Sequence, residues 1–68
     1  MEYLYVRFRE QRRVLVDGTE CGNTNTTLRV QRGAHTITLS DPQDYTPPSQ
    51  DVTVANTTQQ NPMRIEFN

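Results

Sequence analysis

Residues 13–18 read RVLVDG, a short run of aliphatic side chains that ends at Asp17-Gly18. An Asp-Gly pair after such a run favours a tight hairpin turn, because both residues tolerate positive φ angles. Apolar and polar residues alternate with a period of two on either side of this turn, and the 3.6-residue spacing of an amphipathic helix is absent. The stretch therefore predicts a protein built of short β-strands joined by turns.

Six runs with this alternation are predicted as strands. They cover residues 3–9, 13–17, 27–31, 34–39, 51–54 and 63–67. Residues 40–50 hold three prolines and are expected to form an irregular loop around Tyr45. Turns at such close spacing are typical of a small sandwich or barrel. We therefore predict an all-β fold, a small antiparallel β-sandwich of about six to seven short strands, as a single domain over residues 1–68.

The same alternation predicts which side chains form the core. Those expected to face inward are Leu4, Val6, Phe8, Val14, Val16, Leu28, Val30, Ile37, Leu39, Val52, Val54, Met63, Ile65 and Phe67. Tyr45 and Cys21 are expected to cap the two ends of this core. A chain of this length buries only about 60% of the surface that its unfolded form exposes, so the core is expected to be thin.

The composition excludes several classes of protein. One cysteine cannot form an intramolecular disulfide, and one Cys with one His cannot supply a complete zinc site. No segment approaches the roughly 20 apolar residues that cross a bilayer. The sequence contains neither a Gly-rich phosphate loop nor a nucleophile elbow. We therefore expect no enzyme activity, no catalytic residue, no metal, no cofactor and no membrane insertion.

The charges are unevenly distributed along the chain. The formal net charge is −1, yet residues 1–13 carry four Arg against two Glu, and every basic residue is Arg. Arg pairs readily with carboxylates, so ion pairs between neighbouring strands are expected. The net charge argues against a general nucleic-acid-binding surface.

The first predicted strand supplies the candidate binding surface. Tyr3, Tyr5, Arg7 and Arg9 alternate with inward residues and are expected on one outward face. Such side chains can anchor a protein partner, stack on sugars or bases, or simply pair with Thr and acidic neighbours on a solvated sheet. This strand is also expected to be a sheet edge, which can pair with a second copy of the chain.

These residues lead to three hypotheses about function. The preferred one is binding of a protein partner or self-association through the N-terminal strand, with no nucleic acid. The alternatives are a carbohydrate-binding module that uses Tyr3, Tyr5 and Arg7, by analogy with other small sandwiches, and a single-stranded RNA binder.

Three further groups are interpreted as structural. His35 shares the parity of the inward residues of its strand, so a neutral imidazole bonded to a loop carbonyl is expected. Cys21 is expected to be a partly buried thiol without a reactive partner. Asp41, Asp44 and Asp51 could gather around a calcium ion, but their spacing is not that of an EF-hand, and solvated loop acids are expected.

The pattern over residues 13–67 resembles the PEGA domain. The matching parts are VLVDG at 14–18, Gly22, LRV at 28–30, GAHTI at 33–37 and DY at 44–45, where the family usually has Gly-Tyr. Thr24-Asn25 replaces the usual Thr-Pro, and Gln31-Arg32 replaces the usual Pro-Glu.

The resemblance implies a non-catalytic β-sandwich module of bacteria and archaea, often found near cell-envelope proteins or appended to larger chains. It implies structural roles for His35 and Tyr45, and places Gly18, Gly22 and Gly33 in turns. If Met1 is the native start, the protein is expected in the cytoplasm. If the chain is an excised module, it is expected at the cell envelope.

Overall fold

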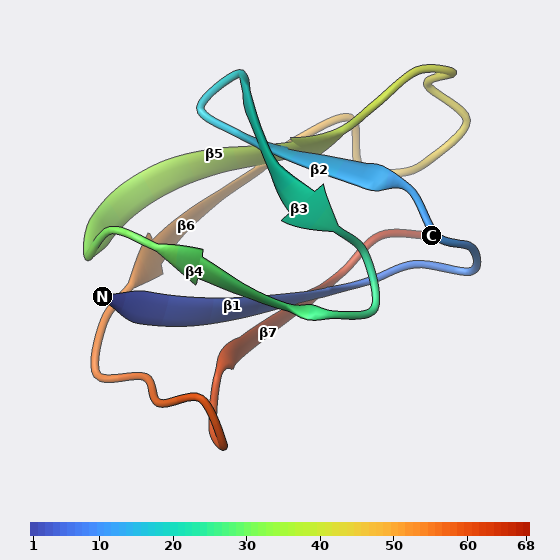
Figure 1. Cartoon of the computed structure of the whole chain (residues 1–68). Helices are drawn as coiled ribbons and strands as arrows, with labels where there is room; N and C mark the ends of the chain where they lie inside the picture. The colour runs from blue at the N-terminus through green and yellow to red at the C-terminus, as the bar shows by residue number, and fades with distance from the viewer.

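A computed structural model describes residues 1–68 as two β-sheets packed face to face (Figure 1). The strands are β1 (Glu2–Arg7), β2 (Arg13–Val16), β3 (Thr19–Asn23), β4 (Thr27–Val30), β5 (Gly33–Leu39), β6 (Gln50–Val54) and β7 (Met63–Glu66). One sheet has the order β4-β1-β7 and the other β3-β2-β5-β6. The predicted all-β sandwich is confirmed. The structure contains no helix that could span a membrane.

The strand that the alternation did not predict is β3. Its sequence, TECGN, has no apolar alternation, because β3 is the edge strand of the four-stranded sheet and is mostly exposed. It forms because Asp17 and Gly18, with φ angles of 54° and 83°, turn the chain directly back beside β2. Two positive φ angles in succession are those of a type I′ hairpin turn.

The first strand is the centre of its sheet and not an edge. β1 pairs antiparallel with β4 on one side and parallel with β7 on the other. The parallel pair departs from the purely antiparallel sandwich that we predicted. Since the backbone of β1 is hydrogen-bonded on both sides, the expectation that a second copy adds to an exposed edge of this strand is wrong.

The core between the sheets closely matches the predicted set. Val52 and Met63 are only partly buried and pack against the core, whereas the other predicted core residues are buried. Tyr45 is buried at one end, as predicted. Cys21, which was expected to cap the other end, is exposed, because no further strand covers β3.

Three aromatic rings close one end of the core. The Tyr45 ring lies edge-on to Phe8 and Phe67, with centroid distances of 6.2 and 5.4 Å. Its hydroxyl donates to the carbonyl of Leu39 (2.9 Å) and accepts from the N–H of the same residue (3.3 Å). The irregular loop of residues 40–50 is thereby fixed against β5.

The three glycines occupy different environments. Gly18 lies in the hairpin turn, as the family resemblance implied, but Gly22 and Gly33 lie within β3 and β5. A Cβ atom on Gly22 would collide with the side chain of Leu28. Gly22 is therefore needed where β3 and β4, edge strands of opposite sheets, approach each other closely.

Thr24 provides a test of how the β1–β2 connection is held. It is buried, and its hydroxyl donates to the carbonyl of Glu10 and accepts from the N–H of Arg12, both at 2.8 Å. Thr24→Val keeps the shape but leaves the N–H of Arg12 unpaired and the Glu10 carbonyl with only the 3.5 Å hydrogen bond from the Asn25 amide, so it should lower the free energy of unfolding by about 1–3 kcal/mol in urea denaturation. Thr53→Val, at an exposed position of β6, should change it by less than about 0.5 kcal/mol. Equal effects of the two substitutions would contradict this role.

Candidate functional site

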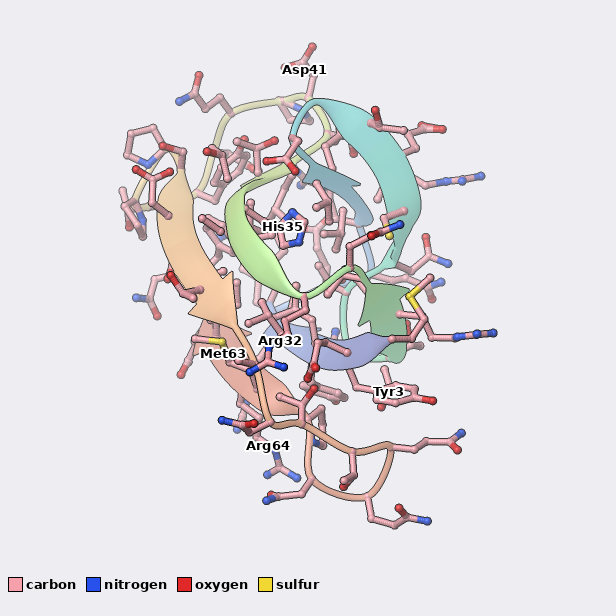
Figure 2. All side chains as sticks on the ribbon, turned by 90° about the vertical axis from the view of Figure 1, so that its left-hand side faces the viewer. Tyr3, Arg32, His35, Asp41, Met63 and Arg64 are labelled. Carbon is pink, nitrogen blue, oxygen red and sulfur yellow. The ribbon has the colours of Figure 1, made fainter.

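The outer face of the three-stranded sheet carries a cluster of aromatic and basic side chains. Because Leu4 and Val6 are buried, the residues that alternate with them face away from the core. The cluster, which we call the Tyr/Arg face, consists of Tyr3, Tyr5, Arg7, Arg29 and Arg64. Figure 2 shows Tyr3 and Arg64 on the side of this sheet that points away from the four-stranded sheet.

The strand register determines which members of the Tyr/Arg face are neighbours. Tyr3 lies opposite Arg29 on β4, and Tyr5 lies opposite Arg64 on β7. The guanidinium carbon of Arg64 is 6.0 Å from the centroid of the Tyr5 ring, within the range of a cation–π contact. Tyr5, Arg7 and Arg64 also line a shallow hollow of about 240 Å³, together with Glu66. Both tyrosines are half-buried and the three arginines are exposed.

The arginines of this face have no acidic partner within the chain. None of Arg7, Arg29 and Arg64 forms an ion pair, although Glu66 is the register neighbour of Arg7. Three arginines without an ion pair therefore lie beside the two tyrosines, with Glu66 as the neighbouring acid. The expectation of cross-strand ion pairs does not hold on this sheet.

Arg9, which was predicted to share this surface, lies elsewhere. β1 ends at Arg7, and beyond it the chain turns toward the loop of residues 40–50. There Arg9 donates to the carboxylate (2.9 Å) and the carbonyl (3.1 Å) of Asp44, and its guanidinium lies 4.5 Å from the centroid of the Phe8 ring. The structure thus brings together Tyr3, Tyr5 and Arg7 but assigns Arg9 to a different cluster.

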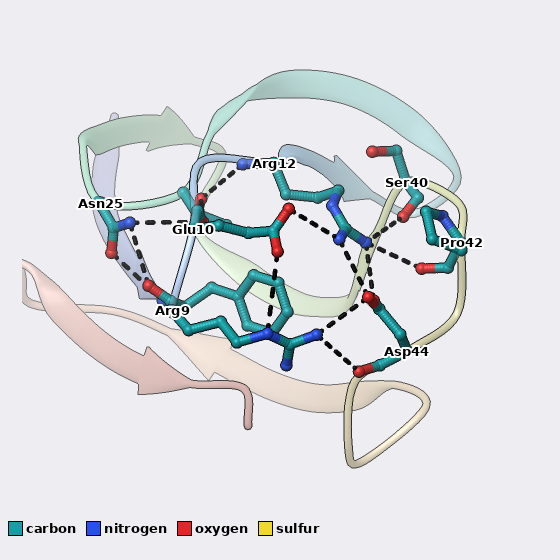
Figure 3. Close-up of polar contacts among 9 residues, drawn as sticks. Arg9, Glu10, Arg12, Asn25, Ser40, Pro42 and Asp44 are labelled. Atoms are coloured by element: carbon teal, nitrogen blue, oxygen red, sulfur yellow. Dashed lines mark hydrogen bonds and ion pairs between the residues drawn. The ribbon is translucent and has the colours of Figure 1, made fainter.

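That second cluster is centred on Arg12 (Figure 3). The Arg12 side chain is only 8% exposed. It donates to the carbonyls of Ser40 (3.2 Å) and Pro42 (2.8 Å) and to the carboxylates of Asp44 (3.0 Å) and Glu10 (3.1 Å). The hydrogen bond from Arg12 lowers the pKa of Asp44. These contacts join the β1–β2 connection to the 40–50 loop, so the cluster is structural.

The three aspartates considered as calcium ligands are engaged separately. Asp44 belongs to the Arg12 cluster, and Asp51 accepts a hydrogen bond from the hydroxyl of Thr36 at 2.9 Å. Asp41 is exposed at the far end of the molecule (Figure 2). The structure contains no group of three His, Cys, Asp or Glu side chains that could hold a metal ion.

His35, on β5, contacts both the β2–β3 turn and the connection between β4 and β5. Its Nδ1 lies 2.7 Å from the carboxylate of Asp17, and its Nε2 lies 2.6 Å from the carbonyl of Gln31. The predicted bond to a loop carbonyl is confirmed, but the pairing with Asp17 was not predicted. Since both ring nitrogens face oxygen acceptors, both must donate, and the protonated imidazole fits the site better than the neutral one that we expected. The hydrogen bond to Asp17, followed by that to Gln31, raises the pKa of His35.

Arg29 and Arg64 are the members of the Tyr/Arg face that sequence reasoning missed. The signal was present, because each alternates with residues that were predicted to face inward. Their association with Tyr3 and Tyr5 depends on β4 and β7 flanking β1, and this strand order could not be read from the alternation.

Comparison with known proteins identifies one family. A family model described as the PEGA domain matches residues 8–66, nearly the whole chain. No curated protein and no solved structure matches. The matched range contains Arg29 and Arg64 and begins just after β1, which carries Tyr3, Tyr5 and Arg7.

The pairing of His35 with Asp17 predicts a pH dependence of stability. The folded-state pKa of His35 is raised from 6.5, so its stabilisation is complete below that pH and is lost as pH rises through the higher folded value. The pKa of Asp17 is lowered from 3.8, so its stabilisation is present above that pH and is lost as pH falls through the lower folded value. The contribution of the pair to stability should therefore be largest between pH 3.8, the ordinary pKa of Asp17, and pH 6.5, the ordinary pKa of His35.

His35→Gln tests this dependence. The difference in unfolding free energy between the wild type and His35→Gln, measured in urea from mildly acidic to alkaline pH, should be largest at mildly acidic pH and shrink as pH rises. Other carboxylates with lowered pKa values, such as Asp44, are present in both proteins and cancel in the difference. A difference that stays constant across the range would show that His35 does not act as a charged partner of Asp17.

Proposed function

The chain belongs to the PEGA domain family, and on this basis we propose that it is a non-catalytic interaction module that binds a protein partner through the Tyr/Arg face. The observation that carries the proposal is the presence of three unpaired arginines beside two half-buried tyrosines on one sheet surface. Tyr and Arg are the residue types most enriched, with Trp, among those that dominate binding energy at protein interfaces.

The position of β1 supports binding through side chains. Hydrogen bonds to β4 and β7 hold both sides of this strand, so Tyr3, Tyr5 and Arg7 of the Tyr/Arg face lie on the most constrained strand of its sheet. A preformed surface loses little conformational entropy when a partner binds. A partner would therefore dock on the face of this sheet instead of adding a strand to β1.

The charge of the face favours a different protein over a second copy of this chain. A two-fold symmetric dimer places the same patch of both copies in contact. The patch with Arg7, Arg29 and Arg64 of one copy would then face the same patch of the other, and like charges across an interface disfavour association.

A binding experiment with matched substitutions tests the proposal. The protein is immobilised and exposed to an extract of its native host, and the bound partner is quantified for the wild type, Tyr5→Ser and Leu15→Ser. Leu15 is half-buried on the outer face of the four-stranded sheet, so its substitution is a matched control. Tyr5→Ser should weaken partner binding by about tenfold or more, while Leu15→Ser retains it. Equal retention by the two variants, both shown to be folded by circular dichroism, would contradict the proposal.

A carbohydrate-binding module is the second candidate. It is favoured by the placement of Tyr3 and Tyr5 two residues apart on one strand face, where consecutive side chains are about 6.5 Å apart and could stack on successive sugar rings. Retention on a panel of immobilised polysaccharides should then be seen for the wild type and lost in Tyr3→Ala and Tyr5→Ala. A wild-type protein that is not retained on any polysaccharide would remove this candidate.

A further inference from the structure

Six of the seven arginines of this protein fall into two groups; the seventh, Arg32, is exposed in the connection between β4 and β5, outside the Tyr/Arg face, and forms no ion pair. Arg9, Arg12 and Arg13 each have a carboxylate oxygen within the chain, at 2.9, 3.0 and 3.8 Å respectively. Arg7, Arg29 and Arg64 have none, and all three lie on the Tyr/Arg face. The first group is paired with carboxylates within the fold, whereas the second places three arginines without an ion pair on one surface, where Glu66 is the neighbouring acid.

The free guanidinium groups surround the two tyrosines. Arg29 and Arg64 come from the strands on opposite sides of β1, and neighbouring strands are about 4.8 Å apart. Arg7 follows Tyr5 on the same face of β1. An Arg side chain presents a planar set of donors that matches a carboxylate with two parallel hydrogen bonds. The face therefore offers carboxylate-binding groups on three sides of an aromatic centre.

We infer that the Tyr/Arg face recognises an extended acidic polypeptide segment, whose carboxylates pair with Arg7, Arg29 and Arg64 while its backbone lies across Tyr3 and Tyr5. This inference rests on the proposed function, since it names the chemistry of the protein partner. Same-side residues of an extended segment are about 6.5 Å apart, which matches the spacing from Tyr3 to Tyr5 and from Tyr5 to Arg7.

The charges around the face favour a polypeptide over nucleic acid. Glu66 lines the same hollow as Arg7 and Arg64. A nucleic-acid strand carries a phosphate at every nucleotide, so some of its charges would lie against Glu66. A peptide can place a neutral residue there and still pair its carboxylates with the arginines.

Fluorescence anisotropy with a short labelled peptide of alternating Glu and Thr tests the inference. The peptide should bind, binding should weaken with added salt, and the same peptide with Gln in place of Glu should bind far more weakly. Arg7→Gln, Arg29→Gln and Arg64→Gln should each reduce affinity about two- to fivefold. Arg13→Gln removes the same charge from the outer side of β2, where the side chain is 60% exposed, and should leave affinity unchanged.

Further outcomes separate this inference from the proposed function. Partner capture that is lost in Tyr5→Ser but unchanged in the three Arg variants would overturn the acidic segment and leave the interaction module standing. Partner capture that is unchanged in Tyr5→Ser and in the three Arg variants would overturn both the acidic segment and the proposed interaction module. Tighter binding of single-stranded RNA or a sulfated polysaccharide than of the Glu peptide, lost in the same Arg variants, would also overturn the inference.

Discussion

The nearly buried guanidinium of Arg12 imposes a constraint on which one end of the sandwich depends. A charged side chain that is 8% exposed must find acceptors for its donors within the protein, because an unpaired charge in such a position is strongly destabilising. Two of the acceptors are the carbonyls of Ser40 and Pro42, and a third is the carboxylate of Asp44. The loop of residues 40–50 must therefore lie over the β1–β2 connection, although it has no regular secondary structure of its own.

The position of this loop then determines how the core closes and where the C-terminus lies. The loop carries Tyr45, whose hydroxyl bonds the backbone of Leu39 and whose ring packs edge-on against Phe67. Two backbone hydrogen bonds, of 2.8 and 2.9 Å, join Thr46 to Asn68, just beyond β7. These bonds hold the chain just beyond β7, the strand that pairs in parallel with β1 and flanks it on the side opposite β4.

The strands and the hairpin turn could be predicted from the sequence, but the contacts between residues far apart in the chain could not. Alternation predicted the inward faces because the direction of a side chain depends only on its position along a strand. The Asp17-Gly18 pair predicted the hairpin turn because the φ angles that a residue tolerates depend on the residue itself. The partnership of Arg12 with Asp44 spans 32 residues and that of His35 with Asp17 spans 18, so neither has a periodic signature. Arg9 was misplaced because its strand ends two residues earlier than the alternation suggested. Val52 and Met63 are only partly buried although Val54 and Ile65 of the same strands are buried, so alternation predicts the side that a residue faces but not how deeply it is buried.

The two kinds of arginine differ in what they contribute to a domain with so thin a core and to the binding surface that we propose for it. Arg9 and Arg12 lie at the loop end, where they stabilise the fold through contacts with Asp44 and with the Phe8 ring. Arg7, Arg29 and Arg64 lie on a sheet whose central strand is already fixed by hydrogen bonds on both sides. Each exposed Arg–carboxylate pair contributes only about 0–1 kcal/mol on its own. In the binding that we propose, such pairs gain from a backbone that loses little freedom on binding: Arg7 lies on the central strand β1, and Arg29 and Arg64 lie on the strands paired with it.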